Sequence, residues 1–241
     1  MAFTVHAVMP GVWHIVDCMG VCMTLLEGEN AAMLVDTGYG IEDVADFMRH
    51  MTDLPLTVFL THNHHDHAMG ARCFPETYML EADMADWRMF TDDKMRRRVL
   101  TQAIGKNLPV DEKTFLAGEI PLPKVMKPGV IDLGGLTAEI IEAPGHTPGS
   151  AVVYVPERKL LLSGDDWNPC TWLFFPQALG LREYRSNMRG IQQLPFEKVL
   201  CPHREALYDR WMFDDFFNAL TDGNLRAAEP VNIAPYEQID T

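Results

Sequence analysis

Long apolar runs, paired cysteines and an excess of basic residues are all missing from this sequence. No apolar run approaches the ~20 residues that a membrane helix needs, so we expect no membrane segment. Residues 1–6 lack a basic stretch followed by an apolar core, so a secretory signal is not expected. The five cysteines are odd in number and lack Cys-x-x-Cys spacing, which is typical of reduced thiols in the cytoplasm.

Basic residues are outnumbered by acidic ones. Lys and Arg number 20 against 34 Asp and Glu, which gives a formal net charge of -14 with His neutral. A nucleic-acid-binding domain usually presents a basic face, so this balance argues against a nucleic-acid partner. We expect a small-molecule substrate as the partner, no membrane contact and a cytoplasmic location, and we leave a homodimer open.

Short apolar runs separated by turn residues fill both halves of the chain. Apolar residues make up 47% of the sequence, enough to bury a sizeable core. The runs predict strands at residues 12–16, 22–26, 31–35, 56–60, 137–141, 151–155 and 160–162. Helical spacing follows the first set at 41–51 and the second at 183–194. Strands and then a helix, stated twice, predict two packed sheets with helices outside, an α/β fold.

Two further segments depart from this pattern. Residues 81–127 are rich in Met, charge and Pro, and their apolar spacing predicts a helical insertion on the β scaffold. Residues 204–223 predict a C-terminal helix that Gly223 stops. We expect one domain over residues 1–241.

The most informative segment is His62-x-His64-x-Asp66-His67, directly after the apolar run 56–60. Alternate residues of an extended chain point the same way, so His62 and His64 can hold one ion together. The chain must then turn, which lets Asp66 and His67 face a second ion. A cluster this dense has little use in packing, because buried imidazoles need partners. His65 points away by alternation and is left out.

Three more candidate ligands each follow an apolar run. His146 lies in the turn 143–150, Asp165 follows the run 160–162, and His203 follows the run 196–200. Each is a weak signal alone, and together they are a strong one. Seven ligands are too many for one tetrahedral ion, so we expect two divalent ions, zinc first, with iron or manganese as alternatives.

These motifs resemble the metallo-β-lactamase superfamily, in the broad group that includes glyoxalase II, over about residues 12–203. The resemblance implies a four-layer αββα sandwich of two mixed sheets, with the metals at one edge. It implies a first ligand set, a second set and a bridge, namely His62, His64 and His146; Asp66, His67 and His203; and Asp165. It also implies that Asp36, in Leu-Val-Asp-Thr-Gly, supports the metal loop from behind.

Departures from the subfamilies narrow the choice. The familiar lactamases of this superfamily lack the bridging aspartate, so Asp165 argues against antibiotic hydrolysis. Flavin-linked diiron relatives carry a glutamate where His64 stands, and the nuclease members are usually longer. Glyoxalase II has a substantial helical domain after its last metal histidine, whereas only residues 204–241 remain here, so a glutathione thioester is not assured.

The motifs predict a hydrolase. Two ions about 3.5–4 Å apart can share a water and lower its pKa towards ~7. We expect a metal-bridging hydroxide to cleave an ester, thioester or lactone of a small molecule, with Asp66 orienting it and accepting its proton. We expect an aromatic substrate wall, with the core as an equal alternative place for its members Trp167, Trp172, Phe174 and Phe175. Trp87 and Phe90 of the insertion could close the other side of the pocket.

Other function classes remain. A persulfide dioxygenase-like protein would use one iron, but the Arg-Asp-Phe stretch of those enzymes after the bridging aspartate is missing here. A phosphodiesterase is disfavoured because few Arg or Lys residues lie close to the motifs. A non-catalytic metal-binding protein is disfavoured because structural zinc sites have every position closed by protein.

Overall fold

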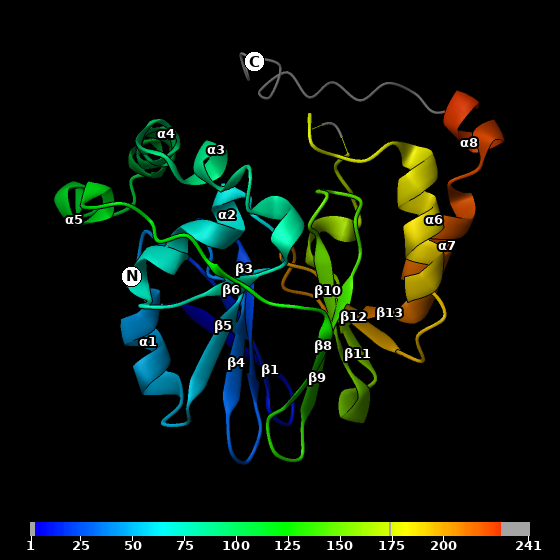
Figure 1. The fold of residues 1–241 in the computed structure, drawn as a ribbon, viewed down its shortest axis with the longest axis horizontal. Helices are drawn as coiled ribbons and strands as arrows, with labels where there is room; N and C mark the ends of the chain where they lie inside the picture. Colours follow the sequence, from blue (N-terminus) through cyan, green and yellow to red (C-terminus); the bar gives the residue numbers. More distant parts are fainter. Residues whose placement is uncertain (1–2, 174, 228–241) are drawn as a thin grey trace.

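The computed structural model describes residues 3–173 and 175–227, which form two sheets packed face to face between helices (Figure 1). The first sheet contains, in order, β1 (Thr4–Met9), β2 (Val12–Val16), β3 (Cys22–Glu27), β4 (Ala32–Val35), β5 (Leu56–Phe59), β6 (Tyr78–Met79) and β7 (Lys124–Val125). The second sheet contains, in order, β13 (Tyr208–Asp209), β12 (Lys198–Leu200), β11 (Leu160–Leu162), β10 (Ala151–Val155), β9 (Thr137–Glu142) and β8 (Gly129–Asp132).

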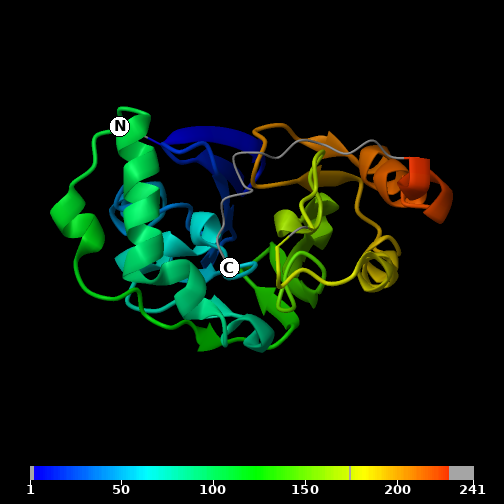
Figure 2. The same cartoon turned by 90° about the horizontal axis from the view of Figure 1, so that it is seen from above.

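Helices connect and flank these strands. The α-helices are α1 (Val44–Met51), α2 (His65–Ala68), α3 (Trp87–Thr91), α4 (Asp93–Gly105), α5 (Glu112–Leu116), α6 (Leu181–Ile191), α7 (Arg210–Ala219) and α8 (Asp222–Ala227). The short 3₁₀ helices are η1 (Met69–Cys73), η2 (Glu81–Asp83), η3 (Pro156–Arg158) and η4 (Gly164–Asp166). Figure 2 shows α4 on the side of the first sheet and α6 to α8 on the opposite side.

Both sheets are mixed, as predicted. β4, β5, β6 and β7 run parallel to one another, and β11 is parallel to β12. The other pairs are antiparallel. Parallel strands end at the same edge, so the residues that follow β11 and β12 emerge side by side. This edge carries the candidate metal ligands of the second sheet.

The four-layer αββα arrangement is confirmed. Between the sheets, Phe59 of the first packs in one buried cluster with Val153 of the second. Outside the first sheet, α1 buries Val44 and Met48, one helical turn apart. Outside the second sheet, buried aromatic and aliphatic residues come from α6 and α7, namely Tyr184, Met188, Ile191, Phe213 and Phe217. Each sheet thus has apolar residues on both faces, which explains the continuous apolar runs.

The insertion region 81–127 contains η2, α3, α4 and α5, and its three α-helices share a cluster around Trp87, Val99 and Phe115. It lies beyond one end of the first sheet (Figure 1). Its last residues do not continue the helical pattern, because β7 pairs with β6 and extends the sheet. Backbone pairing at a sheet edge leaves little trace in so short a sequence.

The predicted helix over residues 204–223 is wrong at both ends. Tyr208 pairs with Val199, so this segment begins as strand β13, and helix α7 starts only at Arg210. Gly223 is not a helix stop, because α7 ends at Ala219 and Gly223 lies inside α8. No helix in the described part of the chain has the length and apolar character to cross a membrane.

Candidate metal centre

The loop after β5 carries four of the candidate ligands. His64 has extended backbone dihedrals (φ -64°, ψ 147°), and α2 begins at the next residue. His62 and His64 therefore come from an extended stretch, with ring centroids 4.7 Å apart, whereas Asp66 and His67 lie in a helical turn. The structure confirms the predicted alternation at His62 and His64 and the turn that follows it. His65 packs instead against Tyr39, with ring centroids 5.5 Å apart.

All seven candidate ligands converge at this edge. Their ligand atoms form three overlapping groups, each with atoms within 4.8 Å of one another, namely His62, His64 and His146; His62, His67 and Asp165; and Asp66, His67 and His203. The first and third groups match the two sets that the resemblance implied. The middle group joins them through Asp165.

The two carboxylate oxygens of Asp165 lie close to histidines of both the first and the third group. Its Oδ2 lies 3.4 Å from His146 Nε2 and 4.0 Å from His62 Nε2. Its Oδ1 lies 3.5 Å from His67 Nε2, and His203 Nε2 lies 3.1 Å from both Oδ1 and Oδ2. A carboxylate placed in this way can be shared by two cations, whose mutual repulsion its negative charge offsets.

The turn that presents Asp165 depends on the residue before it. Gly164 follows β11 with a φ of 51°, a left-handed conformation that glycine adopts readily. A Cβ at Gly164 would lie 3.1 Å from Thr61 Cβ, so the two ligand-bearing loops approach closely here. His203 follows the neighbouring parallel strand β12 and therefore reaches the same edge.

The ring nitrogens fit a divalent cation. Nε2 of His62, His64 and His67 is buried and has no hydrogen-bond partner among the described residues. Buried polar atoms almost always have a partner, so a converging set without one is a natural cation site. His64 Nδ1 and His146 Nε2 lie only 2.8 Å apart. Imidazole nitrogens with aspartate oxygens form a donor set suited to zinc, iron or manganese.

The histidines of the first ligand set and those of the second differ in charge. Burial lowers the pKa of His62 and His64 well below the usual range, so both rings are neutral at pH 7 and keep a free lone pair. Burial acts likewise on His67, but Asp165 and Asp66 outweigh it and raise the pKa of His67 well above its usual range. Burial opposes ionisation of Asp66, yet His67 holds the pKa of Asp66 at about 2. Protons and metal ions therefore compete for the ligand set of Asp66, His67 and His203.

Asp36 supports the loop from behind, at the position that the resemblance indicated. Its Oδ2 lies 3.0 Å from His67 Nδ1, which fixes the ring so that Nε2 faces the cluster. Its Oδ1 accepts the Thr61 backbone N–H at 2.7 Å. Asp36 itself has a φ of 65°, a left-handed conformation that Asp and Asn tolerate better than most residues.

His146 is oriented by two groups that the sequence reasoning missed. Its backbone N–H donates to Asp166 Oδ1 at 3.0 Å, and its Nδ1–H donates to the carbonyl oxygen of Trp172 at 2.7 Å. Burial raises the pKa of Asp166 well above its usual range, which favours the neutral form of its carboxyl. The doubled acid after β11 was the available signal for Asp166. A backbone carbonyl such as that of Trp172 leaves no signal in side-chain chemistry.

The predicted aromatic wall is only partly at the site. Trp172 and Phe175 lie there, with ring centroids 5.6 Å from His203 and 4.7 Å from His64. Trp167 is buried in the core against Phe213, which corrects its assignment to the pocket. Phe174 lies outside the described residues.

Of the two insertion rings that were expected to close the other side of the pocket, Phe90 lies at the site and Trp87 does not. Trp87 is buried in the helical cluster of the insertion, so its assignment to the pocket is also corrected. Phe90, three residues later on α3, packs on His64 with ring centroids 4.4 Å apart. Phe90 and Phe175 thus both contact the same imidazole ring, and the insertion reaches the metal edge.

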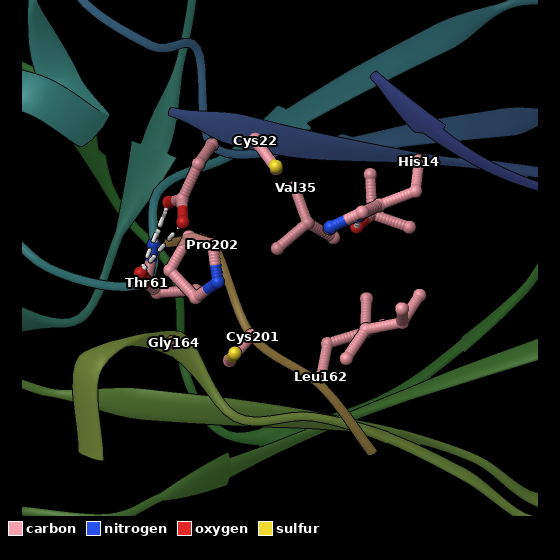
Figure 3. Close-up of a pocket in the computed structure, with 11 residues that line it drawn as sticks. His14, Cys22, Val35, Thr61, Leu162, Gly164, Cys201 and Pro202 are labelled. Carbon is pink, nitrogen blue, oxygen red and sulfur yellow. Dashed lines mark hydrogen bonds between the residues drawn. The ribbon is translucent and has the colours of Figure 1, made fainter. Parts of the chain in front are cut away.

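A small cavity lies behind the loop, between the sheets. Figure 3 shows Cys22 and Cys201 facing it from the two sheets, with Thr61 at one end. It has room for about one water molecule. Burial raises the pKa of Cys22 and of Cys201 to about 12, so neither thiol is a nucleophile at neutral pH. The cavity belongs to the packing of the site, and the free cysteines fit the predicted reduced thiols.

Comparisons with known proteins agree with this geometry. A family model described as the metallo-beta-lactamase superfamily matches residues 16–203. The acyl-coenzyme A thioesterase MBLAC2 of Gallus gallus is 26% identical over an alignment of 202 residues, and the match covers 74% of this chain and 70% of that protein.

Solved structures share the fold. The metallo-beta-lactamase FIM-1 from Pseudomonas aeruginosa, in its mono-zinc form, has a TM-score of 0.65 at 17% identity and covers 95% of this chain and 98% of its own. The protein TTHA1623, in a di-iron-bound form, has a TM-score of 0.57 at 22% identity, and the match covers 83% of this chain and 94% of that chain. At these identities the likeness supports the fold alone.

Proposed function

The chain belongs to the metallo-β-lactamase superfamily, and we propose that it is a binuclear hydrolase of small-molecule thioesters, with carboxylic esters and lactones as neighbouring substrate classes. That it is a metal-dependent hydrolase follows from the family and the His/Asp cluster. What we propose beyond this is the binding of two ions, with zinc as the first candidate, and the specificity for thioesters. The observation that carries it is Asp165, whose two oxygens face the two groups of candidate ligands.

The ligand atoms divide into two sets and a bridge. His62, His64 and His146 would hold one ion, Asp66, His67 and His203 the other, and Asp165 would contact both. When bound, two such ions lower the pKa of a water towards ~7 and polarise a carbonyl oxygen. No Ser or Cys nucleophile is needed.

Asp66 is placed to orient the attacking water. Its Oδ2 lies 3.7 Å from both His67 Nε2 and His203 Nε2, and with a pKa of about 2 it stays ionised. An ionised carboxylate accepts a hydrogen bond from a water and so sets its direction of attack. Because so low a pKa makes a weak base, we assign Asp66 orientation first and proton acceptance second.

The substrate class is argued from the walls of the site. Phe90 and Phe175 cover His64 of the first ligand set, which suits an apolar acyl group. Trp172 lies beside His203 of the second set. The relative from Gallus gallus is named an acyl-coenzyme A thioesterase, which supports thioesters as the first class to test.

A substrate panel with metal analysis tests the proposal. Zinc-loaded protein is assayed for thiol release from acyl-coenzyme A thioesters, for lactone and ester hydrolysis, and for cleavage of bis(4-nitrophenyl) phosphate. We expect thioester hydrolysis to be fastest, to stop on metal removal and to return with zinc. Faster phosphodiester cleavage would overturn the substrate class. Oxygen uptake with a persulfide by a protein holding one iron would overturn hydrolysis in favour of the dioxygenase alternative.

A further inference from the structure

A buried carboxylate outside the ligand set joins the two loops that carry the first histidine set. Asp83, at the end of η2, is 1% exposed and belongs to neither loop. One loop follows β5 in the first sheet and carries His62 and His64. The other connects β9 to β10 in the second sheet and carries His146. Relative movement of these loops would change the distances within the set.

Asp83 binds the first loop at Asn63, the residue between the two histidines. The Asn63 backbone N–H donates to Asp83 Oδ2 at 3.2 Å. The Asn63 side-chain amide donates to the backbone carbonyl of Asp83 at 3.0 Å. Both the backbone and the side chain of Asn63 are thereby fixed, which limits the positions open to its neighbours on either side.

Asp83 binds the second loop on the far side of His146. The Thr147 hydroxyl donates to Asp83 Oδ2 at 2.7 Å, and the Gly149 N–H donates to Asp83 Oδ1 at 2.6 Å. The Ser150 hydroxyl lies 2.9 Å from Thr147 Oγ1 and continues this network. A Cβ at Gly149 would lie 2.6 Å from Asp83 Cγ, so a glycine is needed for this close approach.

We infer that Asp83 is a positioning residue for the first ion, because one buried carboxylate fixes the loop of His62 and His64 against the loop of His146. The inference rests on the proposed metal centre. Ligands must be held within about 0.5 Å of the productive geometry, and buried partners of the ligand loops supply that restraint. A backbone bond from Ala151 N–H to the Thr61 carbonyl at 2.9 Å also joins the loops, so we expect weakened rather than abolished binding.

Asp83→Asn is the direct test, because it changes no volume. Three donors point at the two oxygens of Asp83, whereas an amide has one oxygen, so its NH₂ group must face a donor. The matched control is Glu81→Gln, which makes the same chemical change at an exposed position of the same short helix.

The readout is metal affinity, not turnover. Metal-free protein is titrated with Zn²⁺ against a chromophoric chelator, which gives a dissociation constant for each ion. His203 is a ligand of the second ion, so the binding step that is lost in His203→Ala is assigned to that ion. We expect Asp83→Asn to weaken the first ion about 10–100-fold, with the second ion and the Glu81→Gln control within about threefold of wild type.

Each outcome decides a separate point. Wild-type protein that binds no ion through the first set would overturn the proposed function itself. Wild-type binding with an unchanged first dissociation constant in Asp83→Asn would overturn only the role of Asp83. A purely structural role would lower the unfolding midpoint of the metal-free protein and leave the ratio of the two constants unchanged.

A milder pair of variants keeps the inference falsifiable if Asp83→Asn does not fold. Thr147→Val removes one bond to Asp83, and Thr147→Ser keeps the hydroxyl. We expect Thr147→Val to weaken the first ion severalfold and Thr147→Ser to bind it as wild type does. Equal affinities for the two variants would contradict the inference.

Discussion

The two sheets supply the candidate ligands in different ways. The first sheet gives four of them within six residues of one loop, from His62 to His67, and one carboxylate, Asp36, binds both Thr61 and His67 of that segment. The second sheet gives three, each from a separate strand end, and His146 has supports of its own. A compact motif shares its support, whereas dispersed ligands are supported one at a time. Substitution of a residue that supports the first-sheet loop should therefore affect several ligands, whereas substitution of a residue that supports His146 should affect that ligand alone.

The largest effect is expected where the two sheets meet, at Asp165. Asp165→Asn removes the negative charge that faces both ligand groups, so both ions should bind more weakly and hydrolysis should fall about 10²–10³-fold. Elemental analysis and turnover measured on the same preparation check this. A variant that keeps two metals and near-normal turnover would mean that Asp165 is not the bridge.

The next effect tests shared support in the first sheet. Asn tolerates the left-handed backbone of Asp36, so Asp36→Asn removes the charge without new strain. We expect metal affinity to fall about 10–100-fold, most at the second ion, because His67 loses the negative charge of its partner. Zinc titration of the variant measures it. Loss confined to the first ion would contradict this picture of the loop.

A smaller effect tests individual support in the second sheet. Burial favours the neutral form of the Asp166 carboxyl, and Asp166→Asn keeps an oxygen for the His146 N–H, so this variant should bind both ions nearly as wild type does. Asp166→Ala leaves that buried N–H without a partner and should destabilise the protein by about 1–3 kcal/mol. Denaturant unfolding and zinc titration of the pair check this. A larger defect in Asp166→Asn than in Asp166→Ala would show that the charged carboxylate matters.

The smallest effect is expected at Cys201, two residues before His203 on the second sheet. Its thiol has a pKa of about 12 and is buried, so Cys201→Ala should keep thioester hydrolysis within about twofold of wild type. Loss of activity with retained metal content would identify a nucleophile that the proposed mechanism does not contain.

The same contrast explains what the sequence predicted. His62, His64, Asp66 and His67 form a pattern whose spacing alone indicates metal binding, because their geometry is local. His146, Asp165 and His203 were convincing only together and with the resemblance, because strand order brings them to one place. Strands followed by a helix, stated twice, predicted two packed sheets with helices outside, and the resemblance implied the αββα layers that the buried clusters confirm.

The misses have physical causes. Strand β13 was taken for helix because two residues carry no periodicity, and only pairing with β12 makes them a strand. Trp87 and Trp167 were assigned to the pocket because sequence proximity to the motifs does not say which way a ring points. Asp83 and Trp172 act through bonds to backbone atoms or to distant loops, which no local pattern reveals.

In the proposed function, two ions share Asp165 at the edge where the sheets meet. An anomalous difference map from a crystal of zinc-loaded protein tests it directly. We expect two peaks on either side of the Asp165 carboxylate, one among His62, His64 and His146 and the other among Asp66, His67 and His203. A single peak, or a second peak away from Asp165, in a zinc-saturated crystal would contradict it.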